Sequence, residues 1–399
     1  MATLHPFRAL RPKPELADRV AAVPYDVVST DEARALADGN PLSFLRVSRA
    51  ELELPPATDP YSDAVYERAA QNFASLRALS MVEEEEPSVY FYRLRMGAHT
   101  QTGLAACFSL HEYDGGVIRK HERTRRDKED DRTRHMLALG AQTGPVFLTY
   151  RASGDVNRIA ERTTSKPPLF DFKAADGVQH TIWRADRADR DALVTAVAAV
   201  PALYIADGHH RAASAARARE RTPGKEAQTF LGVAFPHDQV QILPYNRIVK
   251  DLGDLSAERF RHAVDEGFEM APGPATPARR GDIAMYFDGR WHSLRARKAA
   301  DPSDPIGALD VSVLQDRLLA PVLKIGDVRT DKRIDFVGGA RGVGELERLV
   351  QSGKAAVAFS LYPVGVADLM AVSDAGEIMP PKSTWFEPKL RDGLLIHLI

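Results

Sequence analysis

The chain has 399 residues, of which 44% are apolar and 27% charged, and its formal net charge is −2. These values are typical of a globular protein with a sizeable core and room for two domains. A dedicated nucleic-acid binder usually has a strong basic excess, so we do not expect a nucleic-acid partner. Cys107, the only cysteine, cannot form an internal disulfide and is expected in the core. The chain starts without the apolar segment of a signal peptide and has no apolar run of membrane-spanning length, so we expect a cytoplasmic protein.

The first half of the chain predicts helices followed by strands. Ser29 and Glu32 have the spacing of a capping box, which predicts a helix that begins at Ser29 or Thr30 and ends at residues 40–41. A second helix is predicted over residues 61–79, where apolar side chains are available for packing. Beyond it, the pattern predicts strands over residues 89–94, 103–110 and 145–150 and a helix over residues 189–200.

A highly charged segment, residues 119–135, interrupts these strands. If it is helical, one face carries five side chains that are cationic or can become so, at steps of four and three residues: His121, Arg125, Lys128, Arg132 and His135. The acidic residues, Asp131 among them, then lie on the other faces. Such a stripe repels itself unless an anion lies on it, although a charged run is often only a solvated helix. We predict that the stripe closes over a phosphate and that Glu122 lies near an acceptor hydroxyl.

The strongest functional signal is a five-residue turn, Asp207-Gly-His-His-Arg211, between a predicted buried strand (201–206) and an alanine-rich predicted helix (211–221). Gly208 permits a tight turn, and the unpaired amides of the first helical turn favour an anion. Arg211 offers a planar fork for phosphate, while His209 and His210 can donate hydrogen bonds. Asp207 can hold a metal ion, orient a histidine or act as a base. In the alternative interpretation, Asp207 only caps the helix and the histidines only cover a polar surface.

The last third of the chain alternates strands and helices after a proline-rich stretch at residues 271–277. We interpret this stretch as a linker or long loop and expect a first region over residues 1–250 and a C-terminal α/β region over residues 251–399, with the boundary between 250 and 275. Strands and helices are mixed throughout, which predicts an α+β (mixed α/β) fold.

Two resemblances extend these predictions. The stretch Tyr204-Ile-Ala-Asp-Gly-His-His-Arg211, followed by an alanine-rich helix, resembles the phosphate-binding motif of the ParB/sulfiredoxin superfamily in the form found in its free serine kinases. The chain as a whole resembles the domain-of-unknown-function 1015 family. The stretches that carry this second resemblance are Val23-Pro-Tyr-Asp-Val27, Lys120-His-Glu-Arg-Thr124 with Lys128 and Asp131-Arg132, the histidine turn, Ile242-Leu-Pro-Tyr-Asn-Arg247 and Pro380-Pro-Lys-Ser-Thr384.

The superfamily resemblance implies a ParB/sulfiredoxin-like core with large insertions, and a phosphotransferase that acts on the hydroxyl of a free amino acid such as L-serine. ATP, ADP or pyrophosphate would be the donor, with Mg²⁺ held through the phosphates and Asp207. The implied catalytic residues are Asp207, Glu122, His209 and His210. The implied phosphate ligands are Gly208, His209, His210, Arg211, His121, Thr124, Lys128, Arg132, Arg247, Lys382, Ser383 and Thr384.

Several alternatives stay open at this stage. A nucleotide-binding switch of the ParB type, without metabolic turnover, is the second interpretation, and a homodimer is compatible with either. Arg247 fits a structural salt bridge as well as a ligand site, and residues 380–384 lack the glycines of a P-loop. We do not expect zinc, because the chain has no Cys-x-x-Cys and the stretch from His121 to Arg125 lacks the second histidine of a metalloprotease helix.

Overall fold

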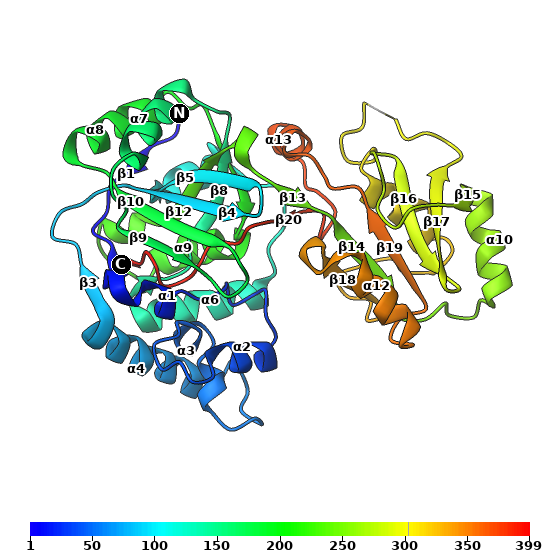
Figure 1. Ribbon diagram of the computed structural model, residues 1–399, viewed down its shortest axis with the longest axis horizontal. Helices are drawn as coiled ribbons and strands as arrows, with labels where there is room; N and C mark the ends of the chain where they lie inside the picture. The colour runs from blue at the N-terminus through cyan, green and yellow to red at the C-terminus, as the bar shows by residue number, and fades with distance from the viewer. Residues whose placement is uncertain (302) are drawn as a thin grey trace. The chain divides into compact units, whose positions relative to one another are not determined.

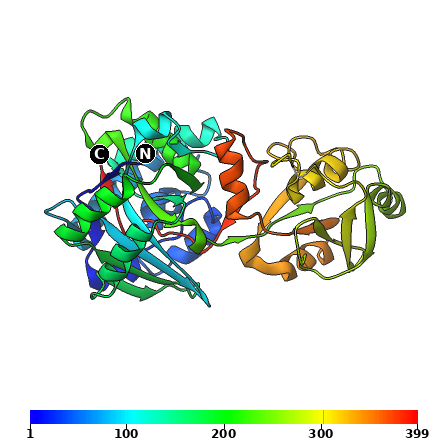
Figure 2. The same ribbon diagram turned by 90° about the horizontal axis from the view of Figure 1, so that it is seen from above.

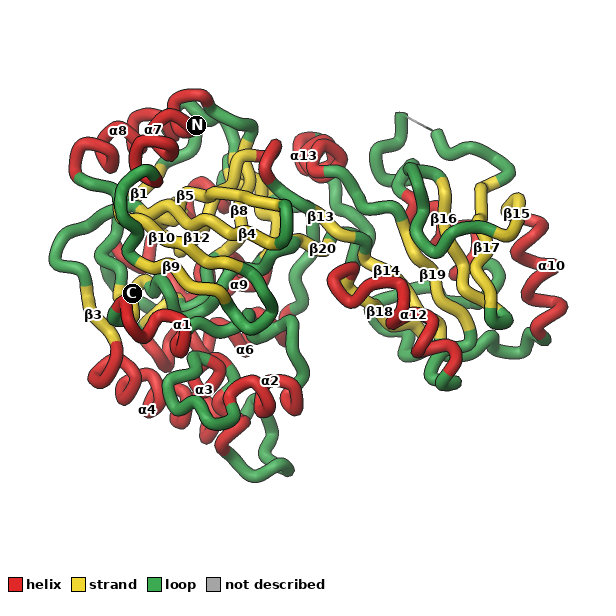
Figure 3. Tube along the Cα trace, viewed as in Figure 1, coloured by secondary structure: helices red, strands yellow, loops and turns green. Residues whose placement is uncertain are grey.

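The computed structural model describes residues 1–301 and 303–399. It divides the chain into two compact units. Unit 1 comprises Met1–Val240 together with Pro388–Ile399, and unit 2 comprises Gln241–Glu387. Both chain termini therefore belong to unit 1 (Figures 1 and 2). Helices and strands are mixed in both units (Figure 3), so the predicted α+β fold class is confirmed.

Unit 1 is built on a nine-stranded mixed sheet with the order β6-β11-β8-β12-β5-β4-β10-β9, to which β1 adds by pairing with β5. Most neighbours are antiparallel, but β12 runs parallel to β8 and β11 runs parallel to β6. The strands are β1 (Leu4–His5), β4 (Tyr90–Met96), β5 (His99–Ser109), β6 (Ile118–Arg119), β8 (Val146–Tyr150), β9 (Phe170–Lys173), β10 (Gln179–Arg184), β11 (Leu203–Asp207) and β12 (Thr229–Pro236). Two short pairs complete the unit: β2 (Leu10–Pro12) with β3 (Met81–Glu83), and β7 (Ala141–Gln142) with β21 (His397–Leu398).

The helices of unit 1 pack in successive layers on this sheet (Figure 1). Helix α9 packs on β8 and β12, α6 packs on α9, and α4 packs on α6, while α7 and α8 pack together near β4, β10 and β1. Buried alanines on α9 (Ala212, Ala215 and Ala218) keep its core face small, which permits this close packing. The helices are α1 (Ala17–Val20), α2 (Thr30–Ala37), α3 (Leu45–Ser48), α4 (Asp63–Ser80), α5 (Leu110–Asp114), α6 (Arg126–Leu139), α7 (Gly154–Thr164), α8 (Arg187–Val197) and α9 (His209–Arg219).

Unit 2 contains a six-stranded sheet with the order β15-β17-β16-β19-β14-β18. Helix α12 packs on β19, β16 and β18, and α10 packs against the edge strand β15. The strands are β14 (Tyr245–Val249), β15 (Phe268–Pro272), β16 (Asp282–Phe287), β17 (Arg290–Ala296), β18 (Ile334–Gly338) and β19 (Val357–Leu361), with a separate pair formed by β13 (Ile242–Leu243) and β20 (Trp385–Phe386). The helices are α10 (Ala257–Gly267), α11 (Asp310–Leu314), α12 (Gly342–Gln351) and α13 (Val366–Asp374).

Local signals in the sequence located several elements correctly. Ser29 and Glu32 form the predicted capping box, and α2 begins at Thr30. The division of the chain into two units differs from the expected boundary between residues 250 and 275. The proline-rich residues 271–277 lie inside unit 2, where they end the edge strand β15, and the chain passes from one unit to the other between Val240 and Gln241. The last twelve residues return to unit 1, because buried apolar residues such as Ile396 pack in its core.

Candidate active site

The histidine turn forms at the end of a buried strand. Strand β11 ends at Asp207, and Gly208 adopts φ +93°, a left-handed conformation that strongly favours glycine. Because this residue reverses the chain at once, α9 begins at His209, two residues earlier than predicted. The N-cap residue of this helix is Gly208, which supplies no side-chain cap, and the carboxylate of Asp207 bonds to Lys389. The positive end of the helix dipole at this turn favours a bound anion.

The segment that precedes α6 lies against this turn. The backbone amide of Arg125 donates to Nε2 of His210 over 3.0 Å, and the amide of His121 makes a longer contact of 3.4 Å with Nε2 of His209. The imidazole rings of His121 and His209 meet edge to face with their centroids 4.5 Å apart. Residues 88 positions apart in the sequence thus share one site.

Glu122 completes a cluster with the two buried histidines. One of its carboxylate oxygens lies 4.0 Å from Nδ1 of His209, and one ligand atom from each of His121, Glu122 and His209 lies within 4.8 Å of the others. Burial lowers the pKa of His121 to about 4, against the opposing fields of the Ile205 carbonyl and Asp207, and burial likewise lowers the pKa of His209. Both rings are therefore neutral at physiological pH, which leaves each with one nitrogen lone pair.

Asp207 is paired with a residue from the end of the chain. Nζ of Lys389 donates to the Asp207 carboxylate over 2.8 Å, and the Lys389 side chain is 11% exposed whereas that of Asp207 is 30% exposed. Burial acts to raise the pKa of Asp207, but the charges of Lys389 and Arg211 outweigh it and hold that pKa below its ordinary value. Asp207 is thus an ionised carboxylate at the first position of the histidine turn.

Arg211 is buried and held by the protein itself. Its guanidinium donates to the carbonyl of Pro145 over 2.8 Å and to the carboxylate of Asp26 over 3.1 Å. Asp392, 2% exposed, also interacts electrostatically with Arg211, and burial raises the pKa of Asp392 to about 7 although Arg211 opposes the shift. A β-carbon at Gly144 would lie 2.7 Å from the Asp392 carboxylate, so this close approach requires glycine.

The charged segment 119–135 differs from the predicted single helical stripe. Helix α6 begins only at Arg126, so His121 and Arg125 precede it and belong to the loop against the histidine turn. Asp131 was expected on an outer face, but it is buried and bonds to Arg132 and to Tyr66. Asp131 therefore neutralises part of the positive charge of the helical stripe. Its pairing with Arg132 is expected, because a buried guanidinium requires a nearby carboxylate.

The remaining stripe residues line a cavity of about 120 Å³ between α6 and the helices before it. Nζ of Lys128 bonds to the Tyr61 hydroxyl over 2.9 Å, the Arg132 guanidinium lies 4.0 Å above the Tyr25 ring, and His135 contacts the carbonyl of Val47 at 3.0 Å. Cations and aromatic rings of the lining suit an anionic or aromatic ligand, and the two carboxylates of the lining, Glu51 and Asp131, are paired with Arg49 and Arg132.

The other predicted ligands have partners of their own. Thr124 bonds to Glu129 in unit 1. In unit 2, Arg247 is 2% exposed and donates to the carbonyls of Tyr245 and Lys382, so it stabilises the loop that carries residues 380–384. The hydroxyl of Ser383 donates to the carbonyl of Pro380 over 2.6 Å within that loop. Their predicted contact with phosphate stays a prediction, as does that of Thr384.

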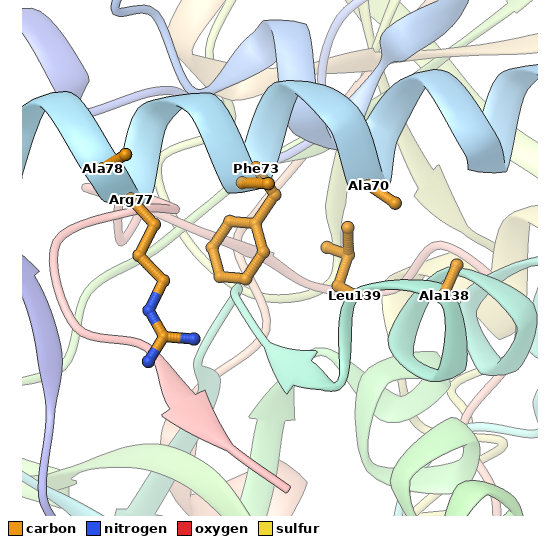
Figure 4. Close-up of a pocket in the computed structure, with 7 residues that line it drawn as sticks. Ala70, Phe73, Arg77, Ala78, Ala138 and Leu139 are labelled. Atoms are coloured by element: carbon orange, nitrogen blue, oxygen red, sulfur yellow. The ribbon is translucent and has the colours of Figure 1, made fainter.

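A larger groove lies between α4 and the end of α6 (Figure 4). Its volume is about 540 Å³, and its lining is apolar except for Arg77, with Phe73 of α4 opposite Leu139 of α6. None of the predicted site residues lines it. Since it has no acid, base or nucleophile apart from one guanidinium, we do not assign the chemistry to it.

Three residues of the site gave no signal in the sequence that we could interpret. Lys389 and Asp392 are isolated charges near the end of the chain, and only the return of that segment to unit 1 places them beside the turn. Asp26 lies two residues after Pro24, in one of the stretches that carry the family resemblance, but nothing in that stretch pairs it with Arg211. The hydrogen bond from Arg211 shows that its carboxylate faces the site.

Fold and site together define a class: a mixed α+β protein with a glycine turn, an uncapped helix and a histidine–carboxylate cluster between strand and helix. The family model described as "Protein of unknown function (DUF1015)" matches residues 4–312. The chain belongs to this family. No curated protein matches the chain significantly.

Several solved structures are similar to the chain at low identity. A free serine kinase in complex with AMP is 14% identical with a TM-score of 0.39, and the match covers 73% of this chain and 92% of that one. A conserved hypothetical protein from Pyrococcus furiosus has the same identity and TM-score, with coverages of 74% and 95%. C-terminally truncated SbnI from Staphylococcus aureus is 11% identical with a TM-score of 0.41, with coverages of 74% and 87%.

Within the described residues, no helix is both long enough and apolar enough to span a membrane.

Proposed function

We propose that the chain is a small-molecule phosphotransferase that transfers a phosphoryl group to the hydroxyl of an amino acid or similar metabolite. The observation that carries this proposal is the uncapped start of α9 directly after Gly208, where two histidines face a loop with its own histidine and carboxylate. The positive end of a helix dipole suits a phosphate, and phosphoryl transfer requires charge neutralisation and alignment more than covalent help.

In the proposed reaction, the acceptor oxygen forms a bond to the terminal phosphorus of ATP, ADP or pyrophosphate, and the bond from that phosphorus to the bridging oxygen breaks. The shortened donor leaves with the electron pair of the broken bond. The acceptor proton passes to a carboxylate, Glu122 or Asp207. The α9 amides with His209 and His210 would hold the donor phosphates, and Lys128 and Arg132 would offset their charge.

Magnesium fits this proposal through the donor rather than through a protein cage. Asp207 offers one ionised carboxylate, which it already shares with Lys389. Mg²⁺ commonly binds through one or two carboxylates plus substrate phosphates and retains water, so a single carboxylate is sufficient. When bound, the ion would neutralise charge on the phosphates.

The motif implies that Arg211 contacts phosphate, but in this proposal Arg211 supports the site indirectly. Its guanidinium is 6% exposed and bonded to Asp26 and Pro145, so it orients the start of α9 and its field favours a bound anion. Direct contact with phosphate would require Arg211 to exchange Asp26 for the ligand.

The test is an unbiased search for product. Purified protein with Mg²⁺ and ATP, ADP or pyrophosphate is incubated with pooled amino acids, L-serine among them, and sugars, and mass spectrometry looks for a new phosphate ester. We expect a donor-dependent ester that the Asp207→Asn variant does not form. Donor loss without an ester would contradict the proposal. Nucleotide binding with neither ester nor donor loss would instead favour the switch, which predicts a change in oligomeric state on binding.

A further inference from the structure

The cluster of His121, Glu122 and His209 has features that phosphate binding does not explain. His121 is 2% exposed, and among the described residues neither of its ring nitrogens makes a hydrogen bond of good geometry. A buried polar group without a partner costs about 1–3 kcal/mol, so such groups usually serve a ligand, an ion or a bound water. The unpartnered ring lies in contact with a second buried histidine and near a carboxylate.

Both histidines are held rigidly. His121 lies directly after β6, whose residue Arg119 pairs with Tyr204 of β11, and His209 opens α9 directly after the Gly208 turn that ends the same strand β11. The backbone of one strand pair therefore fixes the separation of the two rings. Rigid support of this kind is a property of sites whose side chains must converge on one point.

We propose that His121, Glu122 and His209 bind one divalent transition-metal ion of the zinc type. Two imidazoles and one carboxylate form a ligand set used for catalytic zinc, with at least one position left for water or an oxygen of a bound anion. Imidazole nitrogens disfavour Mg²⁺ and Ca²⁺, which prefer oxygen ligands. The site is thus distinct in chemistry from a magnesium ion carried in on a donor.

Metal binding requires the three ligand atoms of the cluster to move slightly closer together. With metal–ligand bonds of about 2.0–2.1 Å, ligand atoms in a tetrahedral site lie roughly 3.4 Å apart, whereas the cluster atoms lie within 4.8 Å of one another. The Glu122 side chain is 36% exposed and its carboxylate lies 4.0 Å from Nδ1 of His209, so a shift of about 1 Å brings these two atoms to the separation of ligands on one metal ion. Coordination through Nδ1 would transfer the His209 proton to Nε2 and end the 3.4 Å contact with the His121 amide. A small reorientation of the His209 ring is therefore part of binding.

Metal binding does not depend on the phosphotransfer proposal, but it changes the role that the proposal gives to Glu122. With Glu122 as a metal ligand, Asp207 remains as the carboxylate that accepts the acceptor proton. The metal site is measured without nucleotide or acceptor, so failure of the phosphotransfer test leaves this inference intact, and the reverse also holds.

The experiment is a zinc titration of chelator-treated full-length protein in competition with a chromophoric chelator. The absorption of Co²⁺ reports the coordination geometry independently. The variants are His121→Gln, Glu122→Gln and His209→Gln, and the matched control is His111→Gln, an exposed histidine of α5 outside the cluster. Circular dichroism and urea unfolding establish that each variant is folded. The Glu122→Gln variant is decisive. The Glu122 side chain is 36% exposed, so its substitution should disturb folding less than substitution of either buried histidine.

We expect wild type and His111→Gln to bind one Zn²⁺ per chain, and each cluster variant to bind at least about tenfold more weakly. Three results would overturn the inference: no stoichiometric Zn²⁺ binding, equal affinity of wild type and Glu122→Gln, or an equal loss in His111→Gln. The last result would show that exposed histidines account for the binding.

Discussion

The buried carboxyl group of Asp392 should make the stability of this protein fall as the pH rises through the neutral range. Burial raises the pKa of Asp392 from 3.8 to about 7, with Asp26 acting in the same direction and Arg211, Arg132 and Arg391 acting against it. Between these two values, the folded protein holds a proton that the unfolded chain has lost. The unfolded state therefore binds fewer protons, and stability decreases with pH until the folded-state pKa is passed.

The magnitude follows from the size of the shift. A shift of about three pH units corresponds to about 4 kcal/mol over the whole window, of which about 2–3 kcal/mol falls between pH 5 and pH 8. Buried histidines act in the opposite direction, since burial lowers the pKa of His135 to about 4 and that of His180 to about 3. Their contribution is lost as the pH falls below the ordinary histidine value, so the pH profile of wild type alone would mix both effects.

The assay is therefore a difference measurement. Urea unfolding of wild type and Asp392→Asn at several pH values between 5 and 8 gives two free energies of unfolding at each pH, and their difference isolates the carboxyl group. The asparagine variant should gain about 2–3 kcal/mol relative to wild type across this range. A difference that stays constant within 0.5 kcal/mol, or that changes in the opposite direction, would refute the reasoning. It would show that water or Arg211 keeps Asp392 ionised in the folded state.

Three further predictions concern the histidine turn and the cation cavity. Lys389→Met should destabilise the protein by about 2 kcal/mol in urea unfolding, because it leaves the partly buried Asp207 carboxylate unpaired, whereas Lys389→Arg should restore most of the loss; equal stability of the methionine variant and wild type would contradict the pairing. Lys128→Ala should weaken nucleotide or pyrophosphate binding more than tenfold by calorimetry, whereas Tyr61→Phe, which removes only the hydroxyl partner of Lys128, should change it by less than about threefold; unchanged binding in the alanine variant would remove the cavity from the proposed site. Gly208→Ala should cost about 1–2 kcal/mol in thermal unfolding, since alanine is strained at φ +93°, and a neutral result would mean that the turn adapts its backbone.

The part of the site that lies on one continuous stretch could be predicted from the sequence. Glycine, two histidines and an alanine-rich run indicate a turn and a helix by local chemistry alone, and the structure places Gly208 and α9 there. The start of the helix was misplaced by two residues, because the sequence does not show that Gly208 would take a positive φ.

Features that depend on distant contacts could not be predicted in this way. A helical stripe was expected from His121 to His135, but the pairing of β6 with β11 extends the chain beside the turn and delays α6 until Arg126. The prediction against zinc depended on short-range patterns, which cannot reveal ligands that lie 88 residues apart. Charge repulsion along the stripe was overestimated, because Asp131 pairs with Arg132 in the interior.

The return of residues 388–399 to unit 1 has a consequence for how the protein matures on the ribosome. Lys389 and Asp392 reach the histidine turn only after the whole of unit 2 has been translated, so a nascent chain that ends before residue 388 has its glycine turn but lacks the partner of Asp207. Strand β21 and Ile396 close the same unit through contacts with β7 and Leu10. Residues 388–399, which are translated after unit 2, thus complete a unit that begins before it, so acquisition of the site depends on translation of both units.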